Sequence, residues 1–304
     1  MDFRQIEAFV HVVRLKSFSK AGEAMYLTQP TISAHINSLE NELGIKLLDR
    51  SNKEIIPTKA GRIFFDYAVN LINTRDNAIF RLSEYSSKME GKIEIAVSTI
   101  PGQYLLPGVI KDFHEKYHNI RFSILQFDSR EVIKELLDGR VEIGIVGSRV
   151  ENDKLIYDFL TEDQLVLITP NNDRYADINS RTLPFEYIAR ENFIFREPGS
   201  GTRLEFERAL KQKGIDPKSL NVIVQMSSPE AIKHSVSIGL GISVVSLLSI
   251  KDYLKFRQIR VFDIEGLNLR RAFYFVHHKN RPISPITQAF KDFTLKYYKS
   301  KVIP

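Results

Sequence analysis

The apolar positions of the first 44 residues recur at the spacing of short amphipathic helices and predict three of them. In the first helix the apolar residues stand at i, i+3, i+4 and i+7, and in the second they are small. In the third they line one side as far as Gly44, a residue that suits a left-handed C-cap. A Ser17-Phe18-Ser19 segment offers caps for the second helix. The apolar positions are Ile6, Phe9, Val10 and Val13, then Ala21, Ala24 and Met25, then Ile32, Ile36, Leu39 and Leu43.

A break at Leu27-Thr28-Gln29-Pro30 separates the second helix from the third. Thr28 is a good N-cap because its hydroxyl accepts from an exposed backbone N–H, and Pro30 falls in the first turn, where its missing N–H costs nothing. Small polar residues off the apolar stripe then open the third helix: Gln29, Thr31, Ser33 and His35. This layout is typical of a helix-turn-helix that presents its second helix to the major groove. The alternative is an ordinary helical hairpin within a core.

Two short strands are predicted directly after the third helix, at residues 47–50 and 54–57, with Ser51-Asn52-Lys53 as the turn between them. A two-stranded wing after a helix-turn-helix defines a winged module. Arg50, Lys53, Thr58 and Lys59 stand where they can contact DNA phosphates.

A long helix is predicted from Thr58 to near Lys88, about 45 Å at 1.5 Å per residue. Its apolar positions recur at spacings close to 3.5, with Arg75 as an interruption, and form one narrow seam. They are Phe64, Ala68, Leu71, Ala78, Leu82 and Tyr85. Such a seam needs a partner. A helix packed on its own chain is one alternative, and pairing with a second subunit is the favoured one, since a two-fold dimer matches a pseudo-palindromic operator.

Strand and helix patterns alternate beyond Gly91 and predict a mostly parallel sheet covered by helices. Ser129 is expected to cap one of these helices. The strands are expected at 93–97, 120–126, 141–146, 165–168, 193–195, 222–224, 242–245 and 272–276. The last strand returns to the first sheet, which gives two α/β lobes joined near residues 161–164 and 265–270. A ligand would lie between the lobes, at strand C-termini and helix N-termini.

Two segments mark the expected cleft. Residues 98–103, with Ser98, Thr99 and Gln103, follow a strand and open a helix. In residues 195–203, a Gly-Ser-Gly-Thr stretch bends a strand end into another helix N-terminus, where backbone N–H groups favour an anion. Its members are Gly199, Ser200, Gly201 and Thr202, flanked by Arg196 and Arg203, whose guanidinium groups can supply charge and hydrogen bonds. The alternative for the Gly-Ser-Gly-Thr stretch alone is a capped turn.

Composition changes this picture little. The chain has 304 residues, a net charge of +6 and no cysteine, which excludes disulfides and thiolate chemistry. The basic excess lies in residues 268–304, so charge by itself is a weak argument for DNA. We expect a cytoplasmic protein, since the N-terminus lacks a signal-peptide pattern and no apolar run is long enough to span a membrane.

The ordered motifs of the N-terminal part resemble those of the LysR-type transcriptional regulators, and the length and second half of the chain fit as well. They comprise Phe9, Ser17-Phe18-Ser19-Lys20-Ala21, Leu27-Thr28-Gln29-Pro30-Thr31-Ile32-Ser33, Leu39-Glu40-Asn41-Glu42-Leu43-Gly44, Leu47-Leu48-Asp49-Arg50 and Pro57-Thr58-Lys59-Ala60-Gly61. The resemblance implies an all-α winged helix-turn-helix at 1–58, a dimerisation helix at 59–90, and an α/β, periplasmic-binding-protein-like effector domain at 91–304. Its lobe I would comprise about 91–161 and 268–304, and its lobe II about 162–267.

The resemblance also carries residue roles. DNA contacts transfer to Gln29, Pro30, Thr31 and Ser33 and to Arg50 in the wing. Effector positions correspond to Ser98, Thr99, Gln103, Gly147, Ser148 and the 200–202 segment, and the arginine-rich form with Arg196 and Arg203 implies a small anion of sulfur or carbon metabolism. The implied partners are double-stranded promoter DNA, RNA polymerase and further copies of the chain as a homodimer or homotetramer.

One departure from the family pattern concerns base reading. Many members carry arginines further along the recognition helix, where this chain has Ala34 and Asn37. Arginine or lysine bidentate to guanine is the commonest specific contact, so we expect the operator to be read partly through A·T content and groove shape.

Three rival classes are disfavoured. An enzyme lacks support, because no serine stands in a nucleophile elbow, the phosphate-loop spacing is missing, and adjacent histidines such as His277-His278 point to opposite faces of a strand. No catalytic residue, metal ligand or cofactor is therefore predicted. A pure solute-binding protein does not need the winged module. An architectural DNA binder does not need a two-lobed cleft.

Overall fold

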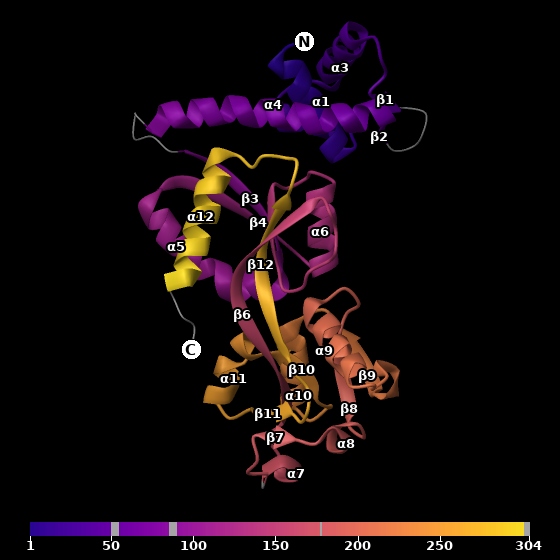
Figure 1. The fold of residues 1–304 in the computed structure, drawn as a ribbon, viewed down its shortest axis with the longest axis vertical. Coiled ribbons are helices and arrows are strands. Elements are labelled where there is room, and N and C mark those ends of the chain that lie inside the picture. Colours follow the sequence, from indigo (N-terminus) through magenta and orange to yellow (C-terminus); the bar gives the residue numbers. More distant parts are fainter. Residues whose placement is uncertain (50–54, 85–89, 177, 301–304) are drawn as a thin grey trace.

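The computed structural model describes residues 1–49, 55–84, 90–176 and 178–300. The molecule is elongated, with the N-terminal helices and the long α4 (Lys59–Glu84) at one end, lobe I in the middle and lobe II at the other end (Figure 1). Two long strands, β6 (Leu155–Pro170) and β12 (Arg270–His278), run from one lobe into the other. Lobe I therefore contacts the N-terminal helices and α4 on one side and lobe II on the opposite side.

The N-terminal module contains three helices, α1 Phe3–Leu15, α2 Phe18–Met25 and α3 Gln29–Leu43. The expected caps are confirmed: Ser17 accepts from the Lys20 N–H, Thr28 accepts from the Thr31 N–H, and Gly44 closes α3 with φ 65°. The wing strands are two residues each, β1 Leu48–Asp49 and β2 Ile56–Pro57, paired antiparallel. They are shorter than predicted, and Arg50 and the 51–53 turn lie outside the described residues.

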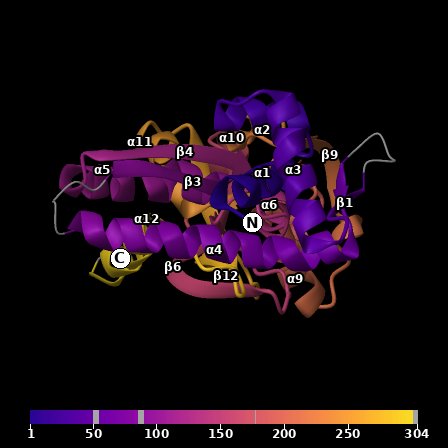
Figure 2. The ribbon, with the colours of Figure 1, turned by 90° about the horizontal axis from the view of Figure 1, so that it is seen from above.

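Helix α4 (Lys59–Glu84) crosses the molecule above lobe I (Figure 2). Its predicted single seam is divided between two faces. One face, with Phe65, Ala68 and Val69, is buried against the core of the N-terminal module. The other exposes a row of large apolar side chains, namely Ile63, Tyr67, Leu71, Ile79 and Leu82. The alternative that the long helix packs on its own chain is therefore correct for the first face of α4. The second face is exposed to solvent.

Lobe I is built on the strand order β4-β3-β5-β12-β6. Strands β3 (Glu90–Ser98), β4 (Asn119–Phe127) and β5 (Ile143–Val146) are parallel, while β12 (Arg270–His278) runs antiparallel to both β5 and β6. The covering helices are α5 Leu106–Lys116, preceded by a π-helical turn Pro101–Leu105, α6 Ser129–Leu137 and α12 Pro285–Ser300. The expected cap of α6 was wrong by one residue. Asp128 is its N-cap and accepts from the backbone of Arg130 and Glu131, because the longer carboxylate reaches both N–H groups.

Lobe II is formed around the second half of β6 (Leu155–Pro170), which pairs with β10 Ser243–Ser246 and β11 Ile259–Ile264. A separate parallel pair joins β8 Asn192–Arg196 to β9 Asn221–Met226, and β7 Thr182–Leu183 extends the sheet beside β11. The helices are α7 Asp173–Ala176, α8 Phe185–Ile188, α9 Gly201–Gln212, α10 Pro229–Ser237 and α11 Lys251–Lys255, with 3-10 turns at Pro217–Ser219 and Leu247–Ser249.

The lobes are joined near the predicted positions, but the connections are continuous strands and not separate crossover segments. Strand β6 starts at Leu155 rather than at 165, and residues 161–164 pair with 270–273 of β12. Polar residues such as Glu162 and Asp163 interrupt the apolar pattern there, which hid the strand.

Candidate DNA-binding face and interlobe site

The start of α3 forms an exposed polar surface. Gln29 and Pro30 are exposed, and Thr31, Ser33 and His35 are partly exposed. The Thr28 and Thr31 hydroxyl oxygens lie 2.8 Å apart, so the cap also holds one of these polar side chains in place. Tyr26, in the left-handed conformation at the end of α2, is 96% exposed beside them. No periodic pattern marks this aromatic, because Tyr26 is the C-cap that follows the last residue of α2.

The segment after the wing has two different roles. The Thr58 hydroxyl donates to the carbonyl of Lys46 (2.8 Å) and accepts from the Gly61 N–H (3.0 Å), so it is used to start α4. Lys59 is exposed and free to approach a phosphate. Arg50 and Lys53 lie outside the described residues.

A buried carboxylate fixes the wing to α3. Glu40 accepts from the backbone N–H groups of Leu47 (2.9 Å) and Leu48 (3.1 Å) and from Lys46 Nζ (2.8 Å). Burial alone would raise the pKa of Glu40, but these hydrogen bonds to the ionised form outweigh it and lower the pKa below its ordinary value. The orientation of the wing therefore depends on this ionised side chain.

The interlobe site brings together residues that are far apart in the chain. Ser98 and Thr99 come from the end of β3 and Ser129 from the start of α6. Arg196 ends β8, the 200–202 segment opens α9, and Arg271 lies on β12. The cavity between these residues has a volume of about 10 Å³, which is room for about one water molecule. The lobes are therefore closed on one another in this structure.

Two of the buried hydroxyl groups lack a partner. Within the described residues, Ser129 Oγ and Ser148 Oγ have no hydrogen bond. A methyl group added at Gly201, in the first turn of α9, would lie 3.1 Å and 3.3 Å from these two oxygens. Buried hydroxyls are normally satisfied, and the first N–H groups of a helix are free to bind an anion. This corner of the site therefore has the donors for one small anionic group.

Arg271 and Asp163 form a buried ion pair that the sequence reasoning missed. Arg271 Nε lies 2.8 Å from Asp163 Oδ2, and Arg271 Nη1 donates to Thr202 Oγ1 at 3.1 Å. The side chains are 3% and 0% exposed. Burial lowers the pKa of Arg271, and Asp163 opposes that effect. The strand register places the two residues opposite each other, which no local pattern reveals.

The two arginines predicted near the site differ. Arg196 donates to both carboxylate oxygens of Glu197 and reaches Thr99 Oγ1 at 3.3 Å, so it bridges the lobes. Arg203 points away, donating to Glu207, Gln225 and the carbonyl of Arg196. Arg203, Gly199 and the exposed Gln103 do not line the interlobe cavity, although Gly199 lies against Asp128, which does.

The paired histidines are held by neighbouring side chains. His277 Nε2 lies 2.9 Å from Lys291 Nζ, and His278 Nδ1 accepts from the Asn280 N–H. Burial lowers the pKa of both rings, that of His278 to about 4. Across the ranges that the structure describes, no three potential metal ligands cluster, and no helix has the length and apolar character needed to cross a bilayer.

Two family descriptions match the chain. Residues 3–62 match "Bacterial regulatory helix-turn-helix protein, lysR family", and residues 86–299 match "LysR substrate binding domain". An uncharacterized HTH-type transcriptional regulator, MJ0300, of Methanocaldococcus jannaschii is 34% identical over 95% of this chain and 97% of its own length.

Solved structures share the fold. Full-length OxyR of Pseudomonas aeruginosa superposes with a TM-score of 0.76 at 17% identity, covering 97% of this chain and 94% of that one. The CcmR regulatory domain of Synechocystis PCC6803, in complex with 2-PG, superposes with a TM-score of 0.63 at 27% identity, covering 69% of this chain and 98% of that one.

Proposed function

The chain belongs to the LysR family of helix-turn-helix regulators, and from this premise we propose that it binds promoter DNA through α3 and the wing and alters that binding when a small anion enters the interlobe site. The observation that supports effector binding is a pair of buried hydroxyls, Ser129 Oγ and Ser148 Oγ, beside Gly201 at the start of α9, which have no hydrogen-bond partner among the described residues.

DNA recognition is assigned to the polar start of α3. Gln29 and Ser33 would face base edges, and the exposed Ala34 and Asn37 provide no charged donor for guanine. We therefore propose an operator read partly by A·T content and groove shape. Phosphate contacts would come from Lys59 and from the wing residues Arg50 and Lys53.

Self-association is supported by exposed apolar surface on α4. Ile63, Tyr67, Ile79 and Leu82 are between 58% and 70% exposed, which favours burial against the same helix of a second subunit. A further contact is available at β4, an edge strand on which Ile124 and Leu125 are exposed. We propose a homodimer through α4 and a homotetramer through the effector domains.

The effector is proposed to be a small anion of carbon or sulfur metabolism. The related CcmR regulatory domain carries 2-PG, and the anion-binding corner here has two free hydroxyls and the α9 N-terminus. A cavity of about 10 Å³ is too small for such a ligand, so the lobes must open about the β6 and β12 connections to admit it. Binding then selects one lobe arrangement by its differential affinity.

The regulatory consequence follows from the linkage between the lobes and the DNA-binding module. We propose that the change in lobe arrangement alters operator bending and the contacts made with RNA polymerase in the cytoplasm. The family consists of transcriptional regulators, and we assign no catalytic residue to this chain.

Selection of genomic fragments by the purified full chain tests the DNA half of the proposal. We expect a pseudo-palindromic, A·T-rich site that is lost when Gln29 and Ser33 are both replaced by alanine. Enrichment of a G·C-rich core, or equal enrichment by the double variant, would contradict this assignment.

A further inference from the structure

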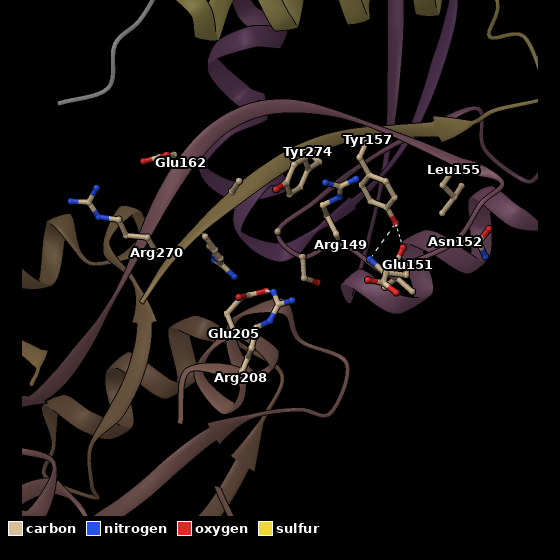
Figure 3. A pocket seen from close by; sticks show the side chains of 15 residues that line it. Arg149, Glu151, Asn152, Leu155, Tyr157, Glu162, Glu205, Arg208, Arg270 and Tyr274 are labelled. Atoms are coloured by element: carbon tan, nitrogen blue, oxygen red, sulfur yellow. Dashed lines mark hydrogen bonds and ion pairs between the residues drawn. The ribbon is translucent and has the colours of Figure 1, made fainter. Parts of the chain in front are cut away.

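A second and much larger cavity lies beside the interlobe site (Figure 3). Its volume is about 670 Å³, within the range typical of small-molecule sites. Lobe I supplies the loop 147–152 after β5, and lobe II supplies Glu205 and Arg208 of α9. The joining strands β6 and β12 form the floor, so anything bound there touches both lobes.

Arg149 is held in place within this cavity by two aromatic rings. Its guanidinium carbon lies 5.2 Å from the Tyr157 ring centroid and 5.4 Å from that of Tyr274. The two rings meet edge to face at 5.9 Å, and the Tyr157 hydroxyl donates to the carbonyl of Val150 and accepts from its N–H. The loop that carries Arg149 is thereby fixed to the sheet, which lowers the ordering cost of binding a ligand.

In the part of the chain that the structure describes, no acidic side chain neutralises the cation of Arg149. Among the described residues, neither Arg149 nor Arg270 has an acidic side chain within ion-pairing distance. Arg208 meets Glu205 only at 3.7 Å, with its side chain 70% exposed. The interlobe arginines differ, since Arg196 and Arg271 are each paired with an acid at 2.8 Å. Guanidinium groups that line a preformed cavity with no close acidic partner, such as that of Arg149, favour carboxylate or phosphate.

The acidic residues of the wall limit which anions fit. Glu151 and Glu162 are exposed at the cavity, and Glu205 lies 3.7 Å from Arg208, so these carboxylates would repel a bulky polyanion. The charged groups of a ligand must therefore lie beside Arg149 on one lobe and Arg208 on the other. A compact molecule with two anionic groups meets this requirement.

We propose that this space, the Arg149 cavity, is a second ligand site for a small organic dianion, either a dicarboxylate or a phosphorylated acid. The inference rests on the proposed function as a ligand-controlled regulator, because the dianion would tie lobe I to lobe II. Arg271 lines both cavities, and Ser148 Oγ of the Arg149 cavity lies 3.3 Å from the position of a methyl group added at Gly201 of the interlobe site. A ligand in the Arg149 cavity therefore touches the wall of the interlobe site and changes its affinity for the first effector.

Calorimetric titration of the full chain with succinate, a dicarboxylate, and with phosphoglycolate, a phosphorylated acid, tests the proposal, with acetate as the singly charged control. At least one dianion binds the wild type and acetate does not compete. Arg149→Gln and Arg208→Gln each raise its Kd about tenfold or more, because each removes a charge-assisted hydrogen bond. Arg149→Lys keeps the charge without the fork and gives a smaller rise. Arg190→Gln, an exposed arginine outside the cavity, changes nothing. The dianion that binds more tightly identifies the source, carboxylate or phosphate.

Several results would overturn the inference. The inference is wrong if neither dianion binds the wild type. It is also wrong if both arginine variants bind the dianion as tightly as the wild type does. If Gly201→Ala abolishes binding while Arg149→Gln leaves it intact, the dianion occupies only the interlobe site. That result would overturn the second site and support the proposed function. If Arg149→Gln does not fold, the Kd of Arg208→Gln tests the inference instead, because Arg208 is exposed and its replacement disturbs no packing.

Discussion

Asp66 of α4 and Arg281 of the segment before α12 form an ion pair, with Oδ1 3.0 Å from Nε, that joins the long helix to lobe I. Arg281 Nη1 also donates to the carbonyls of Leu136 and Leu137, at 3.0 and 3.1 Å, where α6 ends. Ser129, in the first turn of α6, lines the interlobe cavity. One helix about 13 Å long therefore connects the effector site to the DNA-binding module.

Replacing Arg281 with alanine should separate effector binding from the DNA response. Arg281 is 15% and Asp66 44% exposed, and Arg281 also contacts the Leu136 and Leu137 carbonyls, so the replacement should cost about 1–3 kcal/mol and leave a folded chain, which a thermal melt checks. The effector should bind as before, while its effect on operator affinity shrinks by about fivefold or more. Fluorescence anisotropy of labelled operator with and without effector measures this change. Lys279→Ala, an exposed neighbour, serves as the control, and a full response in Arg281→Ala would refute the α6 connection.

Removing only one partner of the Arg271–Asp163 pair should lower the free energy of unfolding more than replacing both partners. Asp163→Asn leaves a buried guanidinium without its counter-charge, which costs about 3–5 kcal/mol in comparable cases. Urea unfolding of the full chain should show that loss, whereas the double replacement Arg271→Met with Asp163→Leu should recover most of it. A single variant as stable as the wild type would show that the pair is open to solvent.

Acid should loosen the wing through Glu40. The folded-state pKa of Glu40 is lowered, so its contribution is fully present above the unfolded value of about 4.3. It is lost as the pH falls through the folded value. Glu40→Gln should therefore be less stable at neutral pH by about 1–3 kcal/mol. The gap should close as the pH is lowered below the ordinary glutamate pKa. Thermal melts across that pH interval measure the gap, and a constant difference would contradict the role given to Glu40.

The N-terminal module was largely predictable from sequence because local chemistry determines it. Thr28, Pro30 and Gly44 act within one turn of their own positions, and each does so as expected. Ser98 and the 200–202 segment also meet in the interlobe cavity, because each follows a strand of its own lobe and the two strand ends face each other between the lobes.

The remaining parts of the site depend on contacts between distant residues. Asp163 and Arg271 are 108 residues apart and meet only through the pairing of β6 with β12. The orientation of Arg203 depends on Glu207 one helical turn away, and the position of Gln103 on a π-helical turn. The Arg149 cavity requires the loop after β5 to face α9. None of these relations has a periodic signature.

The most direct measurement of the central claim is a footprint on operator DNA, made with and without a metabolic anion that stabilises the wild-type chain against heat. Gly201→Ala adds a methyl group 3.1 Å from Ser129 Oγ, which fills the anion-binding corner and spares the Thr202–Arg271 contact. The account predicts that the anion changes the wild-type footprint and leaves that of Gly201→Ala unchanged, with equal DNA affinity in its absence. Identical anion-induced changes in both proteins would contradict it.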